Sequence, residues 1–167
     1  KDDKAGLVTF NEYFDTFVPA SKQVGQMQTL LENLYKQETT FGETDFSALC
    51  GHLGKHVNKR SFLVLYTNFS NMTSLNRQLV YLQQLARQHR VLVVFFEDAD
   101  LKEYIAGKSV TTEDYYRHVI AEKFAFEKRL IVSTLKQHGI YSLLTTPDKL
   151  SIDVINKYLE MKSRQLL

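Results

Sequence analysis

The sequence predicts an α/β protein with a doubly wound, mostly parallel sheet. Three short apolar runs, 61–67, 91–96 and 140–145, have the length and composition of strands that are covered on both faces. Repeats of apolar residues with helical spacing separate these runs, as expected for helical crossovers between parallel strands. Two further runs near the start, 5–10 and 13–18, predict an antiparallel hairpin at the edge of the fold.

Length and composition fit a single globular domain. A chain of 167 residues buries about two-thirds of the surface that it exposes when unfolded, so it needs no disulfide or metal to fold. Its single cysteine, Cys50, suits a reducing compartment. The 21 basic and 19 acidic residues leave a net charge of +2, which is too balanced to favour a nucleic-acid partner. The apolar stretches are too short to span a bilayer, so we expect no direct membrane contact.

The hairpin is the first predicted element. Asn11 and Glu12 separate the runs 5–10 and 13–18, which is the spacing of a tight turn. Pro19 has no backbone N–H to donate to a neighbouring strand, so we expect the second strand to end there.

Two helices are expected between the hairpin and the first buried strand. Ser21 is placed to cap a helix over 23–35, and Thr44 to cap another over 45–56, because their hydroxyl oxygens can accept bonds from the first free amides. The residues expected to face inward in the first of these helices are Met27, Leu30, Leu31 and Leu34.

Further helices alternate with the buried strands. The longest is expected to start with a capping box between Thr111 and Asp114 and to end before Gly139. Pro147 stops the last strand, and Ser151 begins a terminal helix. The residues expected to face the sheet are Leu75, Leu79, Leu82 and Ala86, then Ile120, Phe124, Ile131 and Leu135, and finally Ile152, Ile155 and Leu159.

No nucleophile or closed metal site is apparent in the sequence. His52 and His56 are four residues apart, a spacing that suits a metal, but no motif supplies further ligands. Cys50 lies between leucines in a predicted helix, where a small core residue is expected. Ser70 follows a strand but lacks the glycines of a nucleophile elbow. We therefore expect no catalytic residue.

Binding chemistry in an open parallel sheet is expected where the strands end. The loops there lack the glycines that a phosphate-binding loop needs. Thr44 and Asn68 supply oxygen atoms of the kind that Mg²⁺ prefers, so they are candidate metal positions; a helix cap and a turn residue are the alternatives. The acidic residues Glu97, Asp98 and Asp100, together with Asn68, leave open a small-molecule or phosphoryl-transfer enzyme.

A family resemblance is carried by the segments 3–10, 42–46, 60–69, 89–94 and 158–162. In order along the chain, they resemble a bacterial family catalogued as a domain of unknown function, whose carboxyl-terminal half is similar to a von Willebrand factor A domain. The resemblance covers essentially the whole chain.

The resemblance implies that residues 1–167 form a single partial von Willebrand factor A-like domain of Rossmann type, which lacks its first strand and helix. Because the chain starts at Lys1 and not at methionine, we expect it to be a piece of a longer protein. Family members typically carry amino-terminal transmembrane helices, which places this domain at the cytoplasmic face of the bacterial inner membrane. They are often encoded beside MoxR-type AAA ATPases and are thought to act with them in protein assembly or activation. The implied role is non-catalytic binding of a protein partner.

The same resemblance implies a metal-ion-dependent adhesion site. Thr44 matches its threonine, Asn68 stands where an aspartate is usual, and its Asp-x-Ser-x-Ser motif would lie before Lys1. Because Asn68 carries no charge, we expect no ordered divalent metal here, with Mg²⁺ confined to the full-length domain. The missing strand would lie between 5–10 and 61–67. We expect those two strands to pair directly, or the gap to be filled by a second copy of the chain.

Overall fold

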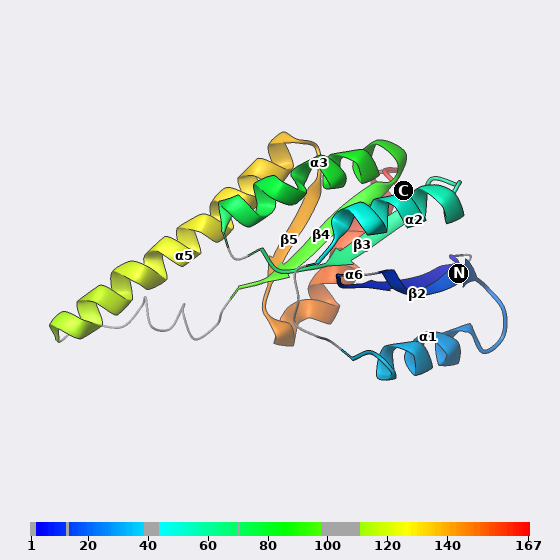
Figure 1. The fold of residues 1–167 in the computed structure, drawn as a ribbon, viewed down its shortest axis with the longest axis horizontal. Helices are drawn as coiled ribbons and strands as arrows, with labels where there is room; N and C mark the ends of the chain where they lie inside the picture. Colours follow the sequence, from blue (N-terminus) through cyan, green and yellow to red (C-terminus); the bar gives the residue numbers. More distant parts are fainter. Residues whose placement is uncertain (1–2, 13, 39–43, 70, 98–110) are drawn as a thin grey trace. The chain divides into compact units, whose positions relative to one another are not determined.

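The fold is described from a computed structural model over residues 3–12, 14–38, 44–69, 71–97 and 111–167 (Figure 1). The chain divides into two units, Lys1–Asn58 and Lys59–Leu167. The elements are β1 (Ala5–Phe10), β2 (Phe14–Ser21), α1 (Gln26–Tyr35), α2 (Phe46–His56), β3 (Phe62–Tyr66), α3 (Met72–Gln88), β4 (Arg90–Phe96), α5 (Thr112–Gln137), β5 (Tyr141–Thr145), the 3-10 turn η1 (Pro147–Lys149) and α6 (Leu150–Ser163).

The second unit contains the parallel sheet that the sequence predicts. Its strands lie in the order β3-β4-β5, and both neighbouring pairs are parallel. The central strand, β4, is the most deeply buried, since residues 91–95 are each at most 2% exposed. The α/β class is therefore confirmed. The strand at 61–67, expected to be central, instead forms one edge of this sheet, and Tyr66 at its end is 55% exposed.

Helices cover both faces of the sheet. Phe62 and Arg90 are register partners, so their side chains share a face, and the Phe62 ring contacts Tyr158 of α6 at 5.9 Å. Phe95 points to the other face, where Lys128 of α5 lies 5.5 Å above its ring. In Figure 1, α3 lies beside α5. Right-handed crossovers from β3 to β4 and from β4 to β5 place both helices on one face.

The long helix α5 confirms its predicted ends. Thr111 and Asp114 form the capping box, and Gly139 follows the helix with a φ of 72°. Its expected inward face is only half right. Ile131 and Leu135 are fully buried, whereas two members of the same stripe are exposed: Ile120 at 53% and Phe124 at 49%.

Length explains this difference in α5. Its 26 residues span about 39 Å, whereas the 5 residues of β5 span about 17 Å. The amino-terminal half of the helix therefore extends past the sheet (Figure 1).

The terminal helix α6 turns a different face to the sheet from the one predicted. The three expected inward residues are exposed: Ile152 at 65%, Ile155 at 56% and Leu159 at 53%. Met161 is buried instead, and Tyr158 contacts Phe62. Apolar residues occur on both faces of this helix, so periodicity alone could not select the inner one. In α3 the fully buried residues are Leu75, Leu82 and Leu85.

The first unit contains the antiparallel hairpin. Leu7 pairs with Val18, and Ala5 pairs with Ser21, with an irregularity in register between them. The expectation that Pro19 ends the second strand is wrong, because β2 continues to Ser21. A proline is tolerated where the ladder is interrupted by a bulge. Gly6 fits the same bulge, because a Cβ there would lie 2.7 Å from the carbonyl oxygen of Val18.

The helices of the first unit start later than predicted. Ser21 belongs to β2, and its hydroxyl accepts from the backbone N–H of Gln23 at 3.1 Å but does not cap α1. Helix α1 begins at Gln26, after Gly25 with a φ of 89°. The side-chain amide of Gln26 donates to the carbonyl oxygen of Ala5 at 2.8 Å. No residue of α1 is buried, so its predicted inward stripe lies largely exposed.

The hairpin β1-β2 belongs to the first unit and the strands β3-β4-β5 to the second, each as its own hydrogen-bonded sheet. The expected direct pairing of 5–10 with 61–67 would join the two units and stays a prediction. Pairing of the β3 edge with a second copy remains a prediction. Among the described helices, none has the combination of length and hydropathy needed to cross a bilayer.

Candidate functional site

The carboxyl ends of the three parallel strands meet at one edge of the second unit. The backbone N–H of Thr67 donates to the carbonyl oxygen of Val94 at 3.0 Å, just beyond β3. The N–H of Glu97 donates to the carbonyl oxygen of Thr145 at 3.0 Å, just beyond β4. These bonds hold the residues that leave β3, β4 and β5 together at one end of the sheet. We call this end the strand-exit edge.

Asn68 meets Lys128 at the strand-exit edge. The ammonium of Lys128, on α5, donates to Asn68 Oδ1 at 2.5 Å and to the carbonyl oxygen of Phe69 at 2.8 Å. Its position above the Phe95 ring removes it partly from water, and this burial lowers the pKa of Lys128. The edge therefore carries a positive charge that is held by two uncharged oxygen atoms.

Sequence reasoning missed Lys128, although a signal was present. It lies on the face of α5 that includes the buried Ala121, Ile131 and Leu135. A lysine on a buried helical face packs its methylene groups among apolar residues, and its ammonium then needs polar groups within bonding distance. That pattern points to a functional or structural partner.

Thr145 and Asp153 form a second polar contact at the strand-exit edge. The hydroxyl of Thr145, a residue only 2% exposed, donates to Asp153 Oδ2 at 2.5 Å. Asp153 belongs to the first turn of α6, so this bond ties the end of β5 to the start of the following helix. The sequence analysis did not predict this contact.

Thr44 is not the helix cap that the sequence predicts. Asp45 is the N-cap of α2, and its carboxylate accepts from the amides of Ser47 at 2.8 Å and Ala48 at 3.1 Å. A carboxylate that accepts two amides satisfies more of the helix start than one hydroxyl can. Thr44 belongs to the first unit and Asn68 to the second, so each is described with its own neighbours.

In the described residues, the surroundings of Asn68 do not suit a divalent metal. Among the residues that the structure describes, no three His, Cys, Asp or Glu side chains gather as metal ligands would. Asn68 Oδ1, the proposed ligand atom, already accepts from a cationic ammonium at 2.5 Å. A second cation against the same oxygen would be repelled by Lys128.

The cysteine and histidine side chains of α2 belong to the packing of the first unit. Cys50 is buried, as expected, and burial, with a smaller contribution from Asp45, raises its pKa to about 11. Its thiol is therefore protonated at neutral pH and is a poor nucleophile. The rings of His52 and His56 stack at 4.2 Å, and Phe17 packs on both. His52 is thus half-buried, whereas His56 is exposed.

For the enzyme alternative, the structure describes only part of the acidic group. Glu97 follows β4 at the strand-exit edge, whereas Asp98 and Asp100 lie outside the described residues. Asn68, the other member, is bonded to Lys128.

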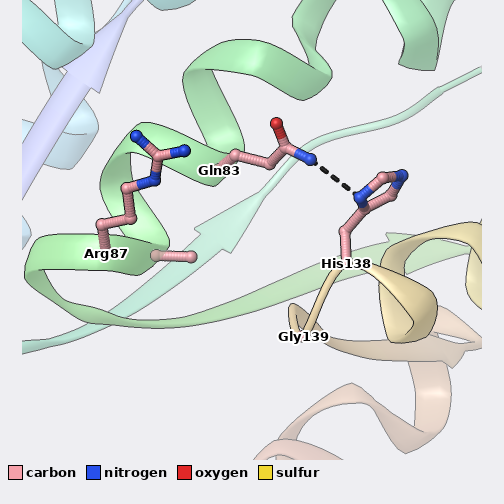
Figure 2. A pocket seen from close by; sticks show the side chains of 5 residues that line it. Gln83, Arg87, His138 and Gly139 are labelled. Carbon is pink, nitrogen blue, oxygen red and sulfur yellow. Dashed lines mark hydrogen bonds between the residues drawn. The ribbon is translucent and has the colours of Figure 1, made fainter.

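A hollow of about 260 Å³ lies between the carboxyl-terminal ends of α3 and α5 (Figure 2). It is lined by Gln83, Ala86, Arg87, His138 and Gly139. The Gln83 amide donates to His138 Nδ1 at 2.8 Å across it. Its volume is below the range of about 300–1,000 Å³ that is usual for small-molecule sites.

The parallel sheet and its covering helices define an α/β domain with an open sheet and a polar strand-exit edge. The chain belongs to the family described as "Protein of unknown function DUF58", which it matches over residues 1–112. The match includes Asn68 but ends before Lys128. No curated protein matches the chain, and no solved structure matches it.

Proposed function

We propose that this chain is a protein-interaction module without catalysis of its own. It would form part of a von Willebrand factor A-like domain in a membrane-anchored bacterial protein, at the cytoplasmic face of the inner membrane. Its partner would be a MoxR-type AAA ATPase, with which it would act in assembling or activating other proteins. Membership of DUF58, the parallel sheet and the resemblance of the chain to that family support this proposal.

One surface feature carries the binding role. Helix α5 exposes apolar side chains along the side opposite its buried face. We call four of these the α5 stripe: Tyr115 (61% exposed), Val119 (45%), Phe126 (59%) and Leu130 (40%).

The α5 stripe follows helical geometry. Because each residue turns an α-helix by about 100°, these four side chains fall on one side, and Ile131 and Leu135 fall on the other. An apolar row that includes two aromatic rings is typical of a surface that contacts another protein.

The test is a binding measurement between the purified chain and a MoxR-type AAA ATPase. The double variant Y115S/F126S should weaken binding at least about tenfold, because aromatic anchors supply much of the energy of such contacts. I152S is the matched control, since Ile152 is an equally exposed apolar residue on α6 (65%). Absence of binding by the unmodified chain, or equal losses in both variants, would contradict the proposal.

A further inference from the structure

We propose that Lys128 is a built-in cation that binds the carboxylate of an acidic side chain from a protein partner at the strand-exit edge. The nature of the partner rests on the proposed function above. The anion site itself rests on the contacts of Lys128.

The ammonium of Lys128 carries three N–H donors, and two of them bond to oxygen atoms of the described residues. These are Asn68 Oδ1 at 2.5 Å and the carbonyl oxygen of Phe69 at 2.8 Å. Both acceptors are uncharged. Within the part of the chain that the structure describes, no carboxylate pairs with this ammonium, so its charge is oriented but not neutralised.

Burial makes a carboxylate ligand favourable here. The ammonium lies 5.5 Å from the centre of the Phe95 ring and is half-buried, and this burial removes part of its hydration and lowers the pKa of Lys128. A charge that is partly desolvated without an opposite charge is costly. An incoming carboxylate would form a short, charge-assisted bond with the remaining N–H and offset that cost.

Asn68 is suited to this role because it is neutral. An aspartate at this position would neutralise the ammonium within the chain, whereas the amide oxygen of Asn68 holds it and leaves its charge available. Asn68 is exposed and Lys128 is half-buried, so the contact lies at the protein surface. The ammonium would also repel a divalent metal, which makes the site one for anions.

The test uses the 167-residue chain with isotope-labelled lysine, observed by NMR at the carbon beside each ammonium. Acetate is the probe, titrated at constant ionic strength against chloride. The Lys128 signal should saturate, and its pKa should rise. Lys123, an exposed lysine on the same helix, is the control and should follow ionic strength alone.

The matched variant is N68D, which supplies a carboxylate from within the chain. It should remove the saturable response to acetate. An acetate response of Lys128 equal to that of Lys123, or the same saturation in N68D, would overturn the proposal. Saturation by inorganic phosphate but not by acetate would also overturn it, since the site would then select a phosphate anion.

Failure of this inference is distinguishable from failure of the proposed function. Saturation by acetate without binding of the ATPase would reject that partner and leave the carboxylate site standing. Binding of the ATPase with unchanged affinity in K128M, and no acetate saturation, would reject the carboxylate site alone.

Discussion

Asn68 and Lys128 are 60 residues apart in the sequence, yet their side chains meet at 2.5 Å where β3 ends. One follows the edge strand of the parallel sheet, and the other comes from the middle of α5. Their bond places a lysine ammonium against Asn68, the residue that the family resemblance matches to a metal-ligand position. The polar chemistry of this edge is therefore that of a cation belonging to the protein.

The first prediction concerns magnesium. Calorimetric titration of the unmodified chain should show no binding of Mg²⁺ in the micromolar range, because Lys128 repels a second cation at Asn68. The variant N68D/K128A removes the ammonium and adds a carboxylate, so it should gain weak binding, about millimolar. Micromolar binding by the unmodified chain would contradict this account of the edge.

The second prediction concerns the bond between Thr145 and Asp153. T145V keeps the shape of the side chain but loses the hydroxyl that donates to Asp153 at 2.5 Å. We expect it to lower the free energy of unfolding by about 1–2 kcal/mol, measured with a chemical denaturant. T145S keeps the hydroxyl and is the control. Equal stability of the two variants would show that this bond contributes little.

The third prediction concerns pH and His89. Its Nδ1 accepts from the amide of Ser61 at 3.3 Å, and its Nε2 is buried without a partner among the described residues. Burial, followed by repulsion from Arg60, lowers the pKa of His89 below the ordinary value of 6.5. The folded chain therefore binds this proton less readily than the unfolded chain does.

Because the unfolded chain binds the His89 proton more tightly, acid should destabilise the folded chain. The contribution of His89 to stability should be complete above pH 6.5 and should fall as the pH drops below that value. Denaturant unfolding at about pH 5 and about pH 8 measures it. H89Q keeps an acceptor for the Ser61 amide and removes the titration, so it should show a smaller loss at acid pH. An equal loss in H89Q would assign the effect to other groups.

The fourth prediction concerns the edge of β3 that faces away from β4. Thr67 and Ser61 direct their backbone groups toward β4, so the N–H groups of Phe62, Val64 and Tyr66 point to the other side. If a second copy pairs with this edge, light scattering should show a dimer whose fraction increases with protein concentration. V64P removes one of these N–H groups and should weaken that dimer. A monomer at all concentrations would exclude the pairing.

The N-cap residues of the helices show what could be predicted from local sequence patterns. The capping box of Thr111 and Asp114 was predictable because its members are close in the sequence and bond to each other's backbone. At α2 the same reasoning chose Thr44, whereas Asp45 is the cap. Two adjacent residues both suit the position. The choice depends on where the preceding chain is held, and the bond from the Asp45 amide to the carbonyl oxygen of Asn11 holds it.

The sequence by itself determined the α/β class, the three parallel strands and the burial of β4, because these follow from alternating blocks of apolar residues. Only the tertiary structure decided how much of an apolar stripe is covered. Ile131 is buried, whereas Ile120 on the same face of α5 is exposed. Only it brought Lys128 to Asn68. Periodicity reports which residues share a face, but contact between distant residues depends on the lengths and crossings of whole elements.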